Sequence, residues 1–116
     1  MTEYTKQLAR FCSSLDYKAI PGQVVEKTKW VILDGLGTIL GGTRFDVGKA
    51  IAKYAQALRD RAEATVLGFG FKSSTRNTAF VNGSLSEILE MQDGYTKGGI
   101  HPSDGTISAA LAIAEW

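Results

Sequence analysis

The chain has 116 residues, which suits one domain with a core of workable size, and its 22% charged and 44% hydrophobic residues are ordinary for a soluble globular protein. A net charge of +1 gives no electrostatic reason to expect binding to nucleic acid or to a membrane surface. The single cysteine, Cys12, excludes an internal disulfide and a cysteine-based zinc site, and no apolar run is long enough to span a bilayer. The first ten residues do not resemble a signal peptide, so we expect a cytoplasmic protein.

The first predicted element is an amphipathic helix from about Thr2 to Ser14. Its apolar face consists of Tyr4, Leu8, Phe11, Cys12 and Leu15 at helical spacing. Because Cys12 lies on that face, we interpret it as a small core residue and not as a reactive thiol. Residues 16–18 are expected to form a turn before the next helix.

A second, longer helix is predicted from Pro21, which suits the first helical position, to about Leu40. Gly35 and Gly37 lie inside it, and each costs roughly 1 kcal/mol relative to Ala in a helix interior. We therefore expect another helix to approach closely at both glycines. Gly41-Gly42 should end the helix. Asp34 stands among apolar residues, either as a solvated residue or as a buried carboxylate bonding a neighbouring helix end, and we favour a structural role.

A third helix is predicted from Val47 to about Asp60, with Asp46 as its N-cap. The segment from Ala64 to Phe71 is the one stretch with β character. It is short and interrupted by glycines, so we interpret it as an extended connector that is available to pair with sequence outside this chain. Its glycines do not indicate a phosphate-binding loop, because no Gly-Lys-Ser/Thr follows them.

A fourth helix is expected to begin after a cap at Ser73 or Ser74 and to run to Asn82. Gly83 should interrupt it, because glycine is a poor helix former. Apolar residues at helical spacing then predict a further helical stretch to about Glu90.

The last helix should begin near residue 102, with Ser103 or Asp104 as its cap. From Ile107 to Trp116 it is apolar on most of its faces, as expected of a buried helix, and no Gly, Asn or Pro terminates it. A buried helix needs packing partners, so we expect this chain to be the N-terminal piece of a longer protein. Together the elements predict an all-α fold, a helical array over residues 1–116.

The loop from Glu90 to Asp104 holds the only histidine, together with several glycines and titratable side chains. Long polar loops between periodic segments are usually either functional or disordered, and apolar anchors within this one favour function. His101 suits a general acid or base, because imidazoles exchange protons near neutral pH. Lys97 could pair with a substrate carboxylate, Asp93 could orient the imidazole, and Glu90 could act as a second acid or base.

The plain alternative is a glycine-rich surface loop whose histidine is structural. A metal site is disfavoured, because one histidine and scattered carboxylates do not make a tight ligand set. A hydrolase with a Ser–His–Asp triad is disfavoured too, because the chain has no Gly-x-Ser-x-Gly elbow.

Several short motifs occur along the chain in a characteristic order. They are Leu8-Ala9-Arg10-Phe11, Ile20-Pro21, Leu33-Asp34-Gly35-Leu36-Gly37, Thr65-Val66-Leu67-Gly68 and Ala79-Phe80-Val81-Asn82-Gly83. The most specific motif is the loop ending His101-Pro102-Ser103, which an Ala-rich helix follows. In this order and spacing the chain resembles, over nearly its whole length, the N-terminal part of the MmgE/PrpD family, which includes 2-methylcitrate dehydratase, cis-aconitate decarboxylase and iminodisuccinate epimerase.

The resemblance implies an enzyme that acts on small di- or tricarboxylates without an organic cofactor. It also implies a large helical domain, a smaller α/β lid domain, and a homodimer. The resemblance further implies that His101, the histidine of the family's His-Pro motif, is catalytic. With the roles assigned above, the expected catalytic residues are His101, Asp93 and Glu90, and the expected substrate-binding residues are Lys97, Ser103 and Gln92.

The family's acidic run often reads Asp-x-Asp-Asp-Thr, and only Asp93 is kept here, while Glu90, Gln92 and Gly94 depart from it. These departures leave dehydration, decarboxylation and epimerisation open. The leading hypothesis is a lyase of the 2-methylcitrate dehydratase type. The alternatives are a dicarboxylate isomerase or epimerase, and an inactive truncated helical domain that only binds or dimerises. The resemblance places further catalytic residues beyond Trp116, so we expect the 116-residue chain alone to be inactive.

Overall fold

The computed structural model describes residues 3–116, and the predicted all-α class is confirmed. In order, the elements are α1 (Glu3–Ser14), a 3₁₀ turn (Tyr17–Ala19), α2 (Gly22–Gly42), α3 (Asp46–Ala57), β1 (Ala64–Val66), β2 (Phe71–Ser73), α4 (Thr75–Glu87) and α5 (Ser103–Glu115). The predicted start of the first helix at Thr2 lies outside the described residues. Within residues 3–116, no helix combines the length and the apolar character needed to cross a membrane.

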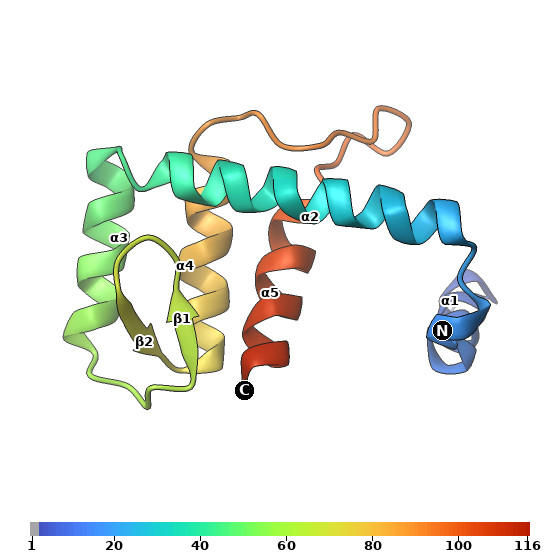
Figure 1. Cartoon of the computed structure of the whole chain (residues 1–116), viewed down its shortest axis with the longest axis horizontal. Helices are drawn as coiled ribbons and strands as arrows, with labels where there is room; N and C mark the ends of the chain where they lie inside the picture. Colours follow the sequence, from blue (N-terminus) through green and yellow to red (C-terminus); the bar gives the residue numbers. More distant parts are fainter. Residues whose placement is uncertain (1–2) are drawn as a thin grey trace.

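The helices α3, α4 and α5 lie side by side, and α2 crosses them near one end (Figure 1). The helices α4 and α5 run in opposite directions, and the hairpin β1–β2 lies against α3 and α4. The core at the centre of this arrangement consists of Ile39, Ala52, Ala55, Val66, Val81 and Leu85. Because α2, α3, β1 and α4 all contribute to it, each of these elements buries one apolar face against the others.

Small residues allow α2 to approach α4 and α5 closely. A Cβ atom added at Gly42 would lie 2.2 Å from the backbone oxygen of Leu85, and one at Gly35 would lie 2.9 Å from Cδ1 of Ile107. The predicted close approach is therefore confirmed at Gly35. It is wrong at Gly37, where an added Cβ would meet no atom within 4 Å.

The segment with β character forms a hairpin of its own. Strands β1 and β2 pair antiparallel with each other, so the segment is a hairpin and not the single extended connector that we expected. Gly68 and Gly70 have φ angles of 77° and 71° in the connecting turn, a backbone region that favours glycine. Asn82 on α4 fixes the turn side of the hairpin, because its amide accepts from the N–H of Leu67 and donates to the carbonyl of Thr65, both at 3.1 Å.

Several predicted helix boundaries need correction. The helix α4 continues through Gly83 instead of breaking there, because α5 packs against this face with Ser108 next to the glycine. It ends at Glu87, before the predicted limit of Glu90. Asp46 is the first residue of α3 and not its N-cap, and its carboxylate pairs with Lys49 at 3.0 Å. Gly41 and Gly42 are the last residues of α2 instead of following it.

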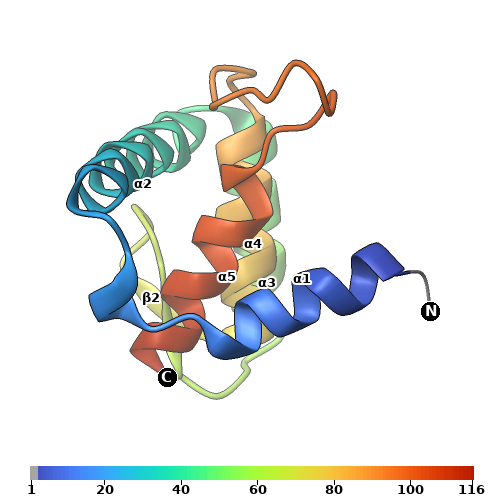
Figure 2. The ribbon, with the colours of Figure 1, turned by 90° about the vertical axis from the view of Figure 1, so that its right-hand side faces the viewer.

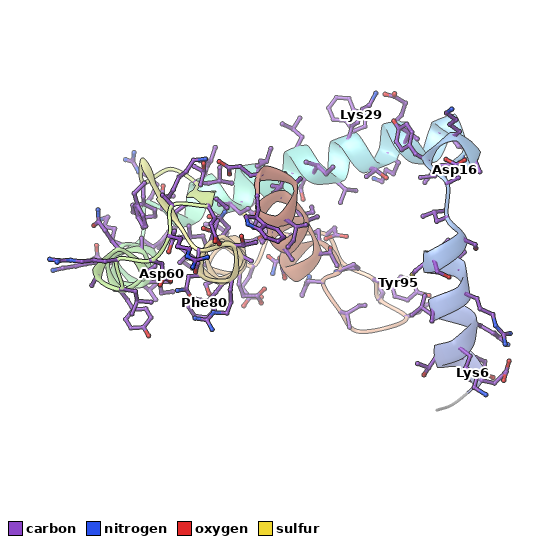
Figure 3. All side chains as sticks on the ribbon, turned by 90° about the horizontal axis from the view of Figure 1, so that it is seen from below. Lys6, Asp16, Lys29, Asp60, Phe80 and Tyr95 are labelled. Atoms are coloured by element: carbon purple, nitrogen blue, oxygen red, sulfur yellow. The ribbon has the colours of Figure 1, made fainter. Side chains whose placement is uncertain are left out.

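The helix α1 and the first half of α2 extend beyond the rest of the molecule (Figures 1 and 3). No residue of α1 is buried, and Tyr4, Leu8 and Phe11 on its apolar face are exposed by 60% or more. The prediction that Cys12 is a core residue is wrong, because the thiol-bearing face of this helix has no cover among residues 3–116.

Candidate functional site

The candidate site is the loop of residues 88–102, which joins α4 to α5 at the end of the pair where α2 crosses (Figure 2). At its start Glu90 has a φ of 51°, in the left-handed region that costs a non-glycine residue on the order of 1 kcal/mol. Tyr95 and Ile100 form an isolated antiparallel bridge, with the N–H of Tyr95 donating to Ile100 at 2.9 Å. Lys97 lies in the tight turn that this bridge closes, and its side chain is exposed.

Three of the predicted site residues meet at the start of α5. The carboxylate of Asp93 accepts hydrogen bonds from the backbone N–H of Ser103 at 3.1 Å and from the Ser103 hydroxyl. The backbone oxygen of Asp93 lies 3.0 Å from Nδ1 of His101. The predicted cap at Ser103 or Asp104 is wrong, because the side chain that receives the first N–H of α5 comes from Asp93, ten residues earlier.

Gln92 belongs to a second, neighbouring group. Its side-chain nitrogen Nε2 donates to Glu87 at 2.8 Å and to Asp104 at 3.2 Å, and the residue is only 8% exposed. Asp104 also accepts from the hydroxyl of Ser86 at 3.1 Å, and that hydroxyl lies 2.9 Å from the hydroxyl of Thr38 on α2. A continuous series of hydrogen bonds therefore joins the base of the loop to α2, α4 and α5.

Negative charges at the base of the loop act on one another. The pKa of Glu87 is raised above its usual value of 4.5, first through its hydrogen bond with Asp104 and then through loss of contact with water and the charges of Asp104 and Glu90. The positive form of His101 opposes this rise. The imidazole therefore lies within electrostatic reach of Glu87, although no hydrogen bond joins the two side chains in the described residues.

Among the remaining predicted site residues, Glu90 donates its backbone N–H to the carbonyl of Glu87 at 3.1 Å. Glu90 and Lys97 are exposed, and His101 is exposed as well, so all three are accessible to a bound molecule. Across residues 3–116, no three His, Cys, Asp or Glu side chains are placed so that they could hold a metal ion.

An apolar groove of about 560 Å³ lies beside the start of the loop. Its walls are Trp30 and Leu33 of α2 together with Leu89 and Met91, and Asp34 and Thr38 are its polar lining. Asp34 is exposed there, so the solvated alternative is confirmed and the buried carboxylate with a structural role, which we favoured, is wrong. The groove adjoins the hydrogen-bond series at Thr38, which belongs to both.

Thr38, Ser86 and Glu87 also border the site, and the sequence did not predict them there. A signal for part of this set is present on α4, where Thr78, Asn82 and Ser86 recur every four residues on the buried face. Polar residues at that spacing form a stripe along a helix. Each of the three is hydrogen-bonded to another element, so the stripe marks the side of α4 that positions the hairpin and the loop.

Comparison with known proteins identifies relatives of the chain. The MmgE/PrpD N-terminal domain matches residues 6–116. Cis-aconitate decarboxylase of Aspergillus terreus is 23% identical and the cis-aconitate decarboxylase-like protein oryM of Aspergillus oryzae is 24% identical, each over 111 residues. Cis-aconitate decarboxylase of Mus musculus is 25% identical over 112 residues. These matches cover 96% of this chain but only 23% of each relative, and no solved structure is significantly similar.

Proposed function

This chain belongs to the MmgE/PrpD family, and from that premise we propose that it is the N-terminal segment of a cofactor-independent lyase for small di- or tricarboxylates. The leading reaction is dehydration of the 2-methylcitrate type. The observation that carries the proposal is the accessible imidazole of His101, which is held at Nδ1 by the backbone of Asp93 and otherwise exposed. Because the chain spans 23% of the length of its relatives, the proposed activity is that of a longer protein.

His101 is the acid–base group in this proposal. A carbon next to a carboxylate gives up its proton only if a base lies within hydrogen-bond reach of it. The imidazole takes that proton, and it returns a proton to the hydroxyl that leaves as water. One exposed side chain with one free ring nitrogen is sufficient for both transfers.

Lys97 is the substrate-binding cation. It lies in the turn closed by Tyr95 and Ile100, so its backbone is fixed while its ammonium group stays in solvent. Ser103 and Gln92, the other expected substrate ligands, have protein partners in the described structure. In this proposal Ser103 and Gln92 support the loop. Glu90, which is exposed, remains the candidate for a second acid or base beside His101.

The test compares His101→Ala with the unaltered protein, both expressed from the complete reading frame, on 2-methylcitrate, citrate and cis-aconitate. We expect turnover and solvent-deuterium exchange to fall by ~10²–10⁴-fold at an unchanged melting temperature. Lys97→Met should raise KM more than it lowers kcat, because it removes a binding charge. Undiminished turnover in His101→Ala would refute the proposed role of the imidazole.

Decarboxylation is the second candidate, because the three relatives compared above bear names of that activity. There the carboxylate leaves as CO₂ and its bonding electrons remain on carbon, which then takes a proton from the imidazole. The two reactions are separated by product: release of CO₂ from cis-aconitate indicates decarboxylation, and loss of water from 2-methylcitrate indicates dehydration.

A further inference from the structure

The contact between His101 and Asp93 determines which ring nitrogen is free. The backbone oxygen of Asp93 lies 3.0 Å from Nδ1, and a carbonyl oxygen can only accept a hydrogen bond. Nδ1 must therefore carry the hydrogen. In the neutral imidazole the lone pair is then on Nε2, the nitrogen on the other side of the ring. Free imidazole side chains favour the opposite arrangement, with hydrogen on Nε2, so the contact selects the minor form.

The carbonyl that makes this selection is itself held in place. The carboxylate of the same residue, Asp93, accepts both the backbone N–H and the hydroxyl of Ser103. Ser103 is the first residue of α5 and is 4% exposed, so it is part of the packed helix and not of the loop. The N-terminus of a helix also favours a negative group, because the first N–H groups and the helix dipole point toward it. Two hydrogen bonds and one favourable charge therefore fix Asp93 from its side chain.

We propose that Ser103 is a positioning residue, which holds Asp93 so that the Asp93 carbonyl keeps His101 in the Nδ1–H form with Nε2 as the proton-transfer atom. The inference rests on the acid–base role of His101 proposed above. When Nε2 accepts a proton from substrate carbon, the Nδ1–H bond to the carbonyl is kept and becomes charge-assisted. When Nε2 returns that proton to the departing hydroxyl, the starting form is restored.

The same arrangement has a consequence for substrate recognition. The backbone N–H and the hydroxyl of Ser103 are already occupied by the protein's own carboxylate, so Ser103 itself is not available to bind the substrate. Ser103 then acts on the reaction only through Asp93 and His101. A variant at Ser103 should change the rate of proton transfer without changing the affinity for substrate.

The test uses the only histidine of the chain, labelled with ¹⁵N in its ring, because protonated and unprotonated ring nitrogens give well separated resonances. At a pH where the imidazole is neutral, we expect the Nδ1–H form to predominate in the unaltered chain. Asp93→Ala should move the majority to the Nε2–H form. Ser103→Ala, which loses the hydroxyl but keeps the N–H, should shift the ratio part of the way, and Ser103→Thr should restore it. Ser13→Ala, which removes an exposed hydroxyl on α1, should change nothing.

A majority of Nε2–H in the unaltered chain would overturn the inference, as would an unchanged ratio in both Asp93→Ala and Ser103→Ala. If circular dichroism shows that Asp93→Ala is unfolded, the two Ser103 variants test the inference on their own. Equal ratios of the two ring forms in Ser103→Ala and Ser103→Thr would then overturn it. Failure of the proposed function has a separate signature. In that case His101→Ala keeps its turnover, whatever the ring nitrogens show.

Discussion

The carboxylates of Glu87 and Asp104 accept hydrogen bonds from one nitrogen atom, Nε2 of Gln92, at 2.8 and 3.2 Å. One amide thus holds two like-charged groups close together, and the pKa of Glu87 lies above its usual value of 4.5. A folded-state pKa above the unfolded one means that the folded chain binds more protons between these two values. Stability therefore rises as the pH falls through this interval, and the pair is least favourable above it.

Replacing Glu87 by Gln removes one of the two charges and keeps an oxygen acceptor for Gln92. We expect Glu87→Gln to have a higher melting temperature than the unaltered chain at pH 7. The difference should shrink as the pH falls through the raised pKa of Glu87 toward 4.5, because the carboxyl of the folded, unaltered chain then becomes neutral. Thermal unfolding followed by circular dichroism at several pH values measures this. Glu3→Gln, which removes the same charge from an exposed site on α1, is the control and should show no such dependence.

Glu115 shifts in the opposite direction. Its pKa is lowered to about 2, first by the hydrogen bond from Lys72 and then by those from the hydroxyl and backbone N–H of Thr65. The stability that this carboxylate contributes is therefore complete above pH 4.5 and is lost as the pH falls toward 2. Glu115→Gln should melt below the unaltered chain at pH 7, with a gap that closes between pH 4.5 and 2. A gap that stays constant across this range would show that the charge is not involved.

Two glycines of α2 provide a matched pair. Gly42→Ala should lower the free energy of unfolding by about 1–3 kcal/mol, because the new Cβ would lie 2.2 Å from a backbone oxygen that cannot turn away. The Cβ added by Gly37→Ala meets no atom within 4 Å, so this variant should raise the free energy of unfolding by up to about 1 kcal/mol through helix propensity. Urea unfolding measures both. Equal stability of the two variants would contradict the tight crossing of α2 over α4.

The apolar face of α1 predicts self-association. Leu8 and Phe11 are 63% and 60% exposed, and a contiguous apolar patch of this kind usually mediates contact with another surface. We expect the 116-residue chain to form oligomers or aggregates in size-exclusion chromatography with light scattering. Leu8→Glu combined with Phe11→Glu should shift it toward monomer. Ala9→Glu combined with Ser13→Glu adds the same charge on the opposite side of α1 and should leave the association unchanged. A monodisperse monomer of the unaltered chain would contradict the expectation.

Local sequence patterns predicted the helices well where the residues within a segment decide whether that segment is helical. The apolar spacing of α1 identified its apolar side. It could not show that no described element covers that side, and for this reason Cys12 was wrongly predicted to be buried. Gly83 shows the converse. Its low helix propensity predicted a break, but packing against α5 outweighs a cost of roughly 1 kcal/mol. In both cases the deciding contacts come from residues distant in sequence.

In the candidate site, too, the sequence predicted the features that depend on neighbouring residues and not those that depend on packing between helices. Asp93 and His101 lie on one loop and Ser103 follows it directly, so their nearness in sequence already indicated that they lie close together. Their mutual geometry was not predictable, since it depends on how the loop closes onto α5. The link from Asp104 through Ser86 to Thr38 joins three helices, and only their packing brings these hydroxyls together.

The hairpin has a consequence for the order of events during synthesis. Its two strands have three residues each, and a two-stranded hairpin is marginal on its own in water. What fixes it is Asn82 on α4 and the carboxylate of Glu115 on α5, and Glu115 follows Thr65 by fifty residues. A ribosome making this chain therefore exposes the hairpin sequence long before its last anchor exists. A ribosome paused after α4 would carry a hairpin that has its anchor at Asn82 but lacks the anchor at Glu115.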